Sequence, residues 1–134
     1  MKHIASCSGG KDSVATLIIA KENNEPLDVV VYCEIMFDEN ISGEVPEHRD
    51  FIYNRLKPFV ENELNVPFVI LQSKKNFVSN FETERIKGKG KGLVRGYPIP
   101  GMCEINRDCK IPPIKEYWKQ AGTDVIQYVG IAID

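Results

Sequence analysis

The feature that most constrains the fold is a strand, a glycine turn, a helix and a second strand within the first 33 residues. Residues 2–7 have strand character, and residues 27–33 form an apolar run with three consecutive valines, which is typical of a strand buried on both faces. Between them, Val14, Leu17 and Ile18 recur at helical spacing, with Lys21 at the edge of the same face. The pattern predicts a βαβ unit, with two parallel strands joined by a right-handed crossover.

The ends of this first helix are also marked. Asp12 or Ser13 is the expected N-cap, and residues 23–26, which end in Pro26, are expected to stop the helix.

The rest of the chain repeats the alternation of strand and helix at a larger scale. Residues 46–65 predict a long helix that is kinked or broken at Lys57-Pro58, and residues 66–71 predict a third strand. Residues 112–120 predict a helix that ends at Gly122, and residues 125–133 predict a fourth strand. The buried face of the long helix is expected to consist of Phe51, Ile52, Leu56, Phe59, Val60 and Leu64. The sum is an α/β fold, a three-layer sandwich with a mostly parallel, Rossmann-like sheet.

Composition limits the class of protein. No linker or repeat divides the 134 residues, so residues 1–134 are expected to form a single domain. No apolar run approaches the roughly 20 residues that span a bilayer, and the N-terminus lacks a signal-peptide core. We therefore expect a cytoplasmic protein with no membrane partner. The net charge of -2 argues against a globally basic nucleic-acid binder.

The four cysteines predict free thiols. Cys7, Cys33, Cys103 and Cys109 are scattered, and the two that lie close together lack the C-x-x-C spacing of metal and redox motifs. No metal ligands and no iron-sulfur cluster are therefore expected.

The turn after the first strand is the strongest functional signal. Ser8-Gly9-Gly10-Lys11-Asp12-Ser13 joins a strand to a helix at the edge where open parallel sheets bind ligands. Two glycines permit close approach of an anion, while the amides at the helix start and the hydroxyls of Ser8 and Ser13 are donors. Composition therefore favours a phosphate site, with a purely structural turn as the alternative.

The same hexapeptide resembles the S-G-G-x-D-S pyrophosphate loop of the adenine-nucleotide alpha-hydrolase superfamily. Three further stretches are similar to its phosphoadenosine phosphosulfate reductase branch. Residues 44–48 resemble a "F-P-E-T" helix start, and residues 102–114 resemble a "W-C-T-x-x-L-K-x-x-P-L" segment with altered spacing. Residues 129–134 resemble a "G-[IL]-R-x-D-E" strand, with Ala132 in place of the usual arginine.

The resemblance implies an adenine nucleotide, either ATP or phosphoadenosine phosphosulfate, whose phosphates rest on Ser8, Gly9, Gly10, Lys11, Asp12 and Ser13. The adenine would lie near residues 33–36. The implied function is sulfur or adenylyl transfer of the reductase type. The alternatives are an ATP pyrophosphatase that activates a tRNA base or a small acid, and a non-catalytic nucleotide-binding subunit of a sulfur-modification complex.

The candidate catalytic residues are Lys11, Asp12, Cys103 and Cys109. Reductases of this branch attack sulfur with a cysteine from a C-terminal tail, which a chain ending at Asp134 is expected to lack. Cys103 and Cys109 are candidate substitutes, with semi-buried structural thiols as the alternative. A thiol donor protein is then an expected partner.

A basic segment lies between the third strand and the last helix. Residues 85–95 alternate glycine with cations, which disfavours a helix and predicts a mobile loop. Lys87, Lys89, Lys91 and Arg95 are candidates for clamping the phosphates of a nucleotide or an RNA backbone, with a solvated loop as the alternative.

Two further sets complete the expectations. His48 is a candidate acid or base, although a surface histidine on a helix is the simpler interpretation. Asp38, Glu39 and Glu44 are carboxylates suited to Mg²⁺ beside a nucleotide, or else they only solvate a loop. The size and charge permit a homodimer without requiring one.

Overall fold

The computed structural model describes residues 1–101 and 103–131. In chain order, the elements are β1 (Lys2–Ser6), α1 (Lys11–Glu22), β2 (Val29–Glu34), α2 (Pro46–Phe51), η1 (Ile52–Leu56), α3 (Lys57–Asn62), β3 (Phe68–Gln72), α4 (Phe77–Glu82), η2 (Asn106–Lys110), α5 (Ile111–Gln120) and β4 (Val125–Val129). The two η elements are π-helical turns. Within the described residues, no helix is long and apolar enough to cross a membrane.

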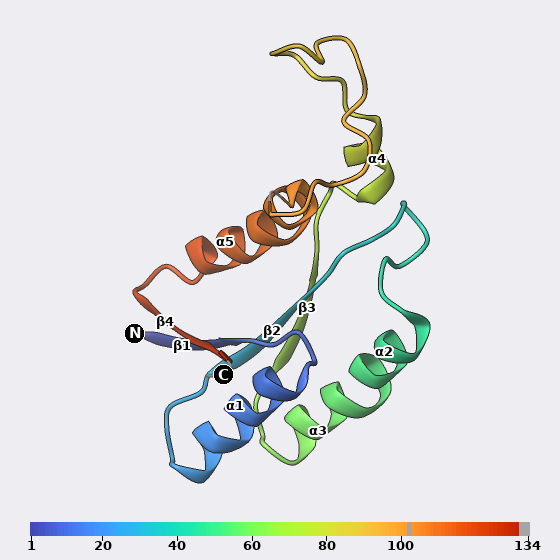
Figure 1. Cartoon of the computed structure of the whole chain (residues 1–134). Coiled ribbons are helices and arrows are strands. Elements are labelled where there is room, and N and C mark those ends of the chain that lie inside the picture. The colour runs from blue at the N-terminus through green and yellow to red at the C-terminus, as the bar shows by residue number, and fades with distance from the viewer. Residues whose placement is uncertain (102, 132–134) are drawn as a thin grey trace.

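The described strands form one parallel sheet in the order β3-β2-β1-β4. Figure 1 shows α1, α2 and α3 on one face of this sheet and α5 on the other. The α/β class and the parallel sheet are therefore confirmed. The chain runs from β1 outward to β3 and then returns, through α5, to the opposite side of β1. The order thus reverses between β1 and β4, which is where open α/β sheets bind ligands.

The core lies on both faces of β2, whose six residues are all buried. Val30 and Tyr32 pack toward the face that holds Leu17 and Val60, while Val29 and Val31 pack with Tyr117 and Trp118 of α5. This alternation is the reason why the valine run has no polar face. Burying each valine contributes about 2 kcal/mol.

Helix α1 differs from the expectation at its start and on its buried face. Gly10 occupies the N-cap position, so the prediction of Asp12 or Ser13 is wrong. The buried residues are Ser13, Leu17 and Ala20, whereas Ile18 is exposed. The buried face of α1 is rotated relative to the predicted one because the small residues Ser13 and Ala20 pack closely on the sheet. The spacing of apolar residues alone does not predict this.

The predicted long helix is present as three consecutive pieces, α2, η1 and α3. Its four fully buried positions are as predicted: Ile52, Leu56, Val60 and Leu64. Instead of a sharp kink there is a π turn, in which the Lys57 N–H bonds the Ile52 carbonyl five residues back. Pro58 has no N–H and its ring crowds the preceding turn, so the turn widens.

The segment before the last helix contains more structure than expected. A capping box between Asn76 and Ser79 starts α4, and the π turn η2 adds a turn in front of the helix that was predicted to begin at Pro112. Gly122, at φ +66°, follows the end of α5 as predicted. Strand β4 ends at Val129, before the predicted end, and Ala132 and Ile133 lie outside the described residues.

Candidate functional site

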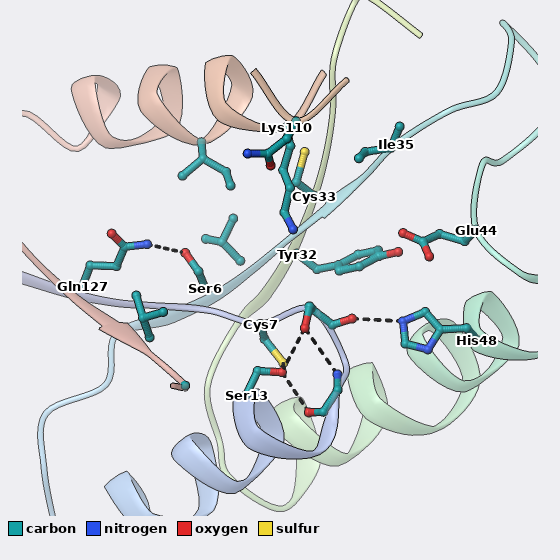
Figure 2. A pocket seen from close by; sticks show the side chains of 17 residues that line it. Ser6, Cys7, Ser13, Tyr32, Cys33, Ile35, Glu44, His48, Lys110 and Gln127 are labelled. Atoms are coloured by element: carbon teal, nitrogen blue, oxygen red, sulfur yellow. Dashed lines mark hydrogen bonds between the residues drawn. The ribbon is translucent and has the colours of Figure 1, made fainter. Parts of the chain in front are cut away.

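A pocket of about 770 Å³ opens at the C-terminal ends of β1, β2 and β4, at the point where the strand order reverses. Its lining residues come from these strands, the glycine turn, α1, the segment after β2, α2, η2 and α5: Ser6, Cys7, Ser8, Gly10, Ser13, Val31, Tyr32, Cys33, Ile35, Glu44, His48, Asn106, Lys110, Ile114, Gln127, Val129 and Gly130. Figure 2 shows the glycine turn and η2 on opposite sides of this pocket.

The glycine turn is held by contacts with its surroundings. Gly9 has φ +81°, and a Cβ on it would collide with Ile52 Cδ1 and lie 3.1 Å from His48 Cε1. His48 Nε2 donates a hydrogen bond of 3.0 Å to the Ser8 carbonyl. The first turn of α2 and η1 thus fix the backbone of the loop, and only glycine is accommodated at position 9. His48 accordingly has a positioning contact with the loop.

The serines of the loop are engaged with each other. Ser13 Oγ donates to the Gly10 carbonyl at 2.9 Å, and Ser8 Oγ lies 3.4 Å from both Ser13 Oγ and the Gly10 nitrogen. Ser13 therefore closes the loop, while Ser8 is the more exposed of the two hydroxyls. In helix α1 the Val14 N–H bonds the Gly10 carbonyl, so the amides that precede Val14 in the first turn are the donors at the helix start.

The end of β4 passes very close to this helix start. A Cβ on Gly130 would lie 2.6 Å from the Asp12 carbonyl oxygen and 2.8 Å from the Ser13 nitrogen. Glycine at position 130 is thus required for β4 to form a wall of the pocket beside α1.

Not every residue of the predicted site faces the pocket. Ser8, Gly10 and Ser13 line it, whereas Gly9, Lys11 and Asp12 do not, and Lys11 is exposed. Lys87, Lys89, Lys91 and Arg95 also lie outside the lining, on the segment that follows α4. Figure 1 shows that segment projecting beyond α4, away from α1.

The lysine of the pocket is Lys110, which was not among the predicted site residues. It is the last residue of η2, and Figure 2 shows its side chain reaching toward Tyr32 and the glycine turn. It forms no ion pair with any described acidic residue, and its charge acts to lower the pKa of Cys33. The available sequence signal for Lys110 is the Pro112-Pro113 pair. In both places where the described residues form a π turn, a proline follows it two residues later, at Pro58 and at Pro112. Such turns often occur at functional sites.

Tyr32 and Glu44 form a second polar group in the pocket. Tyr32 is 2% exposed, and its hydroxyl makes no hydrogen bond with any described residue. Figure 2 shows this hydroxyl directed toward the Glu44 carboxylate. Burial, together with the nearby charge of Glu44, raises the pKa of Tyr32. Because the Glu44 carboxylate is close enough to act on this hydroxyl, the two groups form a polar pair in the pocket lining, and both are candidate contacts for a ligand.

The cysteines differ in their environments. Cys33 lines the pocket, and burial raises its pKa to about 11, so its thiol is protonated at neutral pH. Cys109 is fully buried, with its pKa raised by burial, and does not line the pocket. Cys103 is exposed and is not among the lining residues, although its sulfur accepts the N–H of Asn106, which does line the pocket. Neither predicted catalytic cysteine therefore faces the site.

Sequence inspection missed the buried carboxylate of Glu34. It is 0% exposed and accepts hydrogen bonds from Ser42, Arg49, Tyr53 and Gln72 at 2.7–2.9 Å. Burial acts to raise the pKa of Glu34, but these hydrogen bonds outweigh it, so the pKa lies below its usual value.

This network joins β2, β3, α2 and the loop that leads to Glu44, so it positions one side of the pocket. The available signal was an acid at the end of an otherwise apolar strand, which requires buried partners.

The predicted carboxylates for Mg²⁺ do not gather. Asp38 accepts the N–H groups of Asn40 and Ile41 within its own turn, Glu39 is exposed, and Glu44 lines the pocket. Among the described residues, no group of three or more His, Cys, Asp or Glu side chains is arranged to hold a metal ion. One carboxylate with phosphate oxygens is still a ligand set that Mg²⁺ accepts, so Glu44 is the residue that fits a nucleotide-bound ion.

The fold and the pocket define the class of the protein: an α/β protein with a parallel sheet and a glycine turn at the point where the strand order reverses. Comparisons with protein-family models, with curated proteins and with solved structures give no match.

Proposed function

We propose that this protein binds an adenine nucleotide in the pocket at the ends of β1, β2 and β4, with the phosphates on the loop of residues 8–13. The observation that carries the proposal is the convergence of three anion-binding groups on one pocket: the glycine turn, the amides at the start of α1, and the Lys110 ammonium. Helix starts and lysines are the usual partners of phosphate groups.

The adenine is assigned to the opposite part of the pocket, beside Cys33 and Ile35. The resemblance of the loop to the adenine-nucleotide alpha-hydrolase superfamily places the base near residues 33–36, and the apolar surface there suits a planar base. Glu44 would hold Mg²⁺ that arrives with ATP.

For the reaction, we favour adenylyl transfer with release of pyrophosphate, as in the ATP pyrophosphatases. The state of the thiols supports this choice, since Cys33 is protonated and Cys103 and Cys109 lie outside the pocket. Sulfur transfer of the phosphoadenosine phosphosulfate reductase type is the second candidate, because Cys33 does line the pocket. It would require an external thiol donor protein.

A thermal-shift panel tests the binding. ATP, ADP, adenylyl sulfate and phosphoadenosine phosphosulfate are compared with and without Mg²⁺, because a ligand that binds only the folded state raises the melting temperature. Gly10→Val is the matched variant, since a Cβ there meets only Ser8 Oγ, at an ordinary 3.5 Å. We expect it to fold normally and to lose the shift. An unchanged shift would reject the site.

Product assays then separate the two reactions. Pyrophosphate release from ATP with Mg²⁺ supports adenylyl transfer, whereas thiol-dependent sulfite release from phosphoadenosine phosphosulfate supports the reductase. Binding without turnover in either assay selects the third function, a non-catalytic nucleotide-binding subunit.

A further inference from the structure

The basic segment after α4 is an ordered arm that the nucleotide pocket does not use. We call residues 83–95 the basic arm. Its two sides are joined by backbone hydrogen bonds from Arg95 N–H to the Thr83 carbonyl, from Arg85 N–H to the Leu93 carbonyl, and from Gly92 N–H to the Arg85 carbonyl, at 2.8–2.9 Å. The sequence predicted a mobile loop, whereas the structure shows a hydrogen-bonded hairpin that projects beyond α4 (Figure 1).

Charge is segregated onto this arm. It contains five of the 17 lysines and arginines of the chain but only one of its 19 acidic residues, although the whole chain has a net charge of -2. Lys87, Lys89 and Lys91 are exposed, and none forms an ion pair with a described residue. Solubility alone does not require a concentrated positive arm on an otherwise acidic molecule, so the arrangement points to an anionic partner.

The base of the arm is anchored rather than free. Arg95 donates to Asn80 Oδ1 at 3.1 Å and to Asp108 Oδ2 at 3.0 Å, and Asn80 is 4% exposed. Asp108 belongs to η2, the turn that presents Lys110 to the pocket. Arg95 is therefore a structural residue that ties the base of the arm to α4 and η2.

A row of aromatic rings, two of them exposed and two half-buried, continues from the base of the arm. Tyr97 is 77% exposed although its ring contacts Phe81 edge-on, with centroids 5.0 Å apart. Phe77 lies 6.3 Å from Tyr97 and stacks on Phe37, which is 42% exposed. Phe37 lies two residues after Ile35 of the pocket lining. We call Tyr97, Phe81, Phe77 and Phe37 the aromatic row.

We propose that the basic arm and the aromatic row bind single-stranded nucleic acid, with Lys87, Lys89 and Lys91 on the phosphates and a base stacked on Tyr97. Cations along the backbone combined with exposed rings are the features by which proteins hold single strands. An acidic protein surface would match the lysines, but it gives no reason for a row of rings beside them. The proposal does not depend on the function of the nucleotide pocket.

The test is fluorescence anisotropy with the full chain and labelled oligonucleotides of about 20 nucleotides, one of RNA and one of DNA. The variant carries Lys87→Gln, Lys89→Gln and Lys91→Gln. Its control carries Lys21→Gln, Lys115→Gln and Lys119→Gln, which remove the same charge from exposed sites on α1 and α5. We expect the arm variant to bind at least about tenfold more weakly at low salt, with the salt slope reduced by about 2. The control should change affinity less than about threefold.

Substitutions of Tyr97 give a second test of binding, because they leave the net charge of the arm unchanged. Tyr97→Ala should weaken binding about tenfold, whereas Tyr97→Phe should retain it, because stacking needs only the ring. Circular dichroism and an unchanged urea-unfolding midpoint verify that each variant is folded.

Weaker binding by the lysine variant and by Tyr97→Ala, with either oligonucleotide, supports the proposal. Tighter binding of the RNA or of the DNA then identifies which of the two is the preferred polymer. Equal losses in the arm and control variants, or full binding by Tyr97→Ala, would overturn it. Displacement by polyglutamate as effective as by the unlabelled oligonucleotide would instead identify an acidic polypeptide as the partner.

Discussion

The glycine turn of residues 8–13 and the basic arm are similar in composition but differ in what holds them. Both combine glycines with lysines, and both contain left-handed glycines: Gly9 at φ +81° and Gly88 at φ +80°. A Cβ on Gly9 would collide with Ile52, whereas a Cβ on Gly88 would have no atom within 4 Å. The turn is shaped by the helix packed against it, and the arm by its own backbone bonds. Two left-handed glycines thus differ in how tightly their surroundings exclude a side chain.

The two regions also differ in where their charge acts. Lys11 belongs to the turn but lies outside the pocket, and the pocket instead receives Lys110 from a segment about 100 residues later. The lysines of the arm remain on the exposed hairpin. The lysine within the glycine-turn sequence is therefore not the lysine that lines the pocket.

The largest expected effect separates the two glycines. Gly9→Ala should lower the free energy of unfolding by about 3 kcal/mol, through left-handed strain and the collision with Ile52. Gly88→Ala should cost about 1 kcal/mol, from the strain alone. Urea denaturation measures both, and equal costs would refute the idea that packing constrains only the turn.

The next largest effect concerns Glu34, whose hydrogen bonds hold one side of the pocket next to the glycine turn. Glu34→Gln should destabilise the protein by about 2 kcal/mol at pH 7, because it removes a buried charge that accepts four hydrogen bonds. The folded pKa lies below the usual value, so this stabilisation is complete above the unfolded pKa and is lost as the pH falls through the folded pKa.

The measurement is urea unfolding of both proteins from pH 7 down to pH 3. The difference between the wild type and Glu34→Gln should shrink as the pH decreases. Glu61→Gln, which removes an exposed partner of Lys57 on α3, is the control and should change stability by less than about 1 kcal/mol. A difference for Glu34 that is constant with pH would contradict the assignment.

A smaller effect distinguishes the two lysines. Lys110→Met should weaken nucleotide binding about tenfold, since it removes a charged donor from the pocket. Lys11→Met should change it less than about threefold, because that side chain does not line the pocket. Isothermal titration calorimetry with ATP gives both affinities. The reverse order would return the predicted role to Lys11.

The smallest effect leaves stability and affinity unchanged and concerns the thiols. At pH 8, iodoacetamide should modify exposed Cys103 at least about tenfold faster than Cys33, whose pKa of about 11 leaves little thiolate. Mass spectrometry of timed samples gives the two rates. Bound ATP should slow Cys33 further without affecting Cys103. Rapid labelling of Cys33 would instead favour sulfur transfer.

The comparison also shows how far local pattern extends. The strands, the first, long and last helices, and the buried face of residues 51–64 were predicted, because period and β-branched runs reflect burial directly. Helix α4 was not predicted. The N-cap of α1, its rotated face and the π turns were not, because they depend on the fit between elements. Of the pocket lining, Ser8, Gly10 and Ser13 were predicted from the glycine turn, and Glu44 was predicted as a carboxylate beside a nucleotide. Tyr32 and Lys110 come from separate segments that no local pattern connects to the turn.

By itself, the sequence determined the βαβ alternation, the parallel sheet and the glycine turn after β1. These follow from hydrophobic period and from the backbone freedom of glycine, which are local properties. Only the tertiary structure decided that Lys110 rather than Lys11 faces the pocket, that Glu34 is the buried anchor, and that the basic arm stands apart. Each of these depends on contacts between residues far apart in the chain, since a side chain reaches a site only when the packing of its element directs it there.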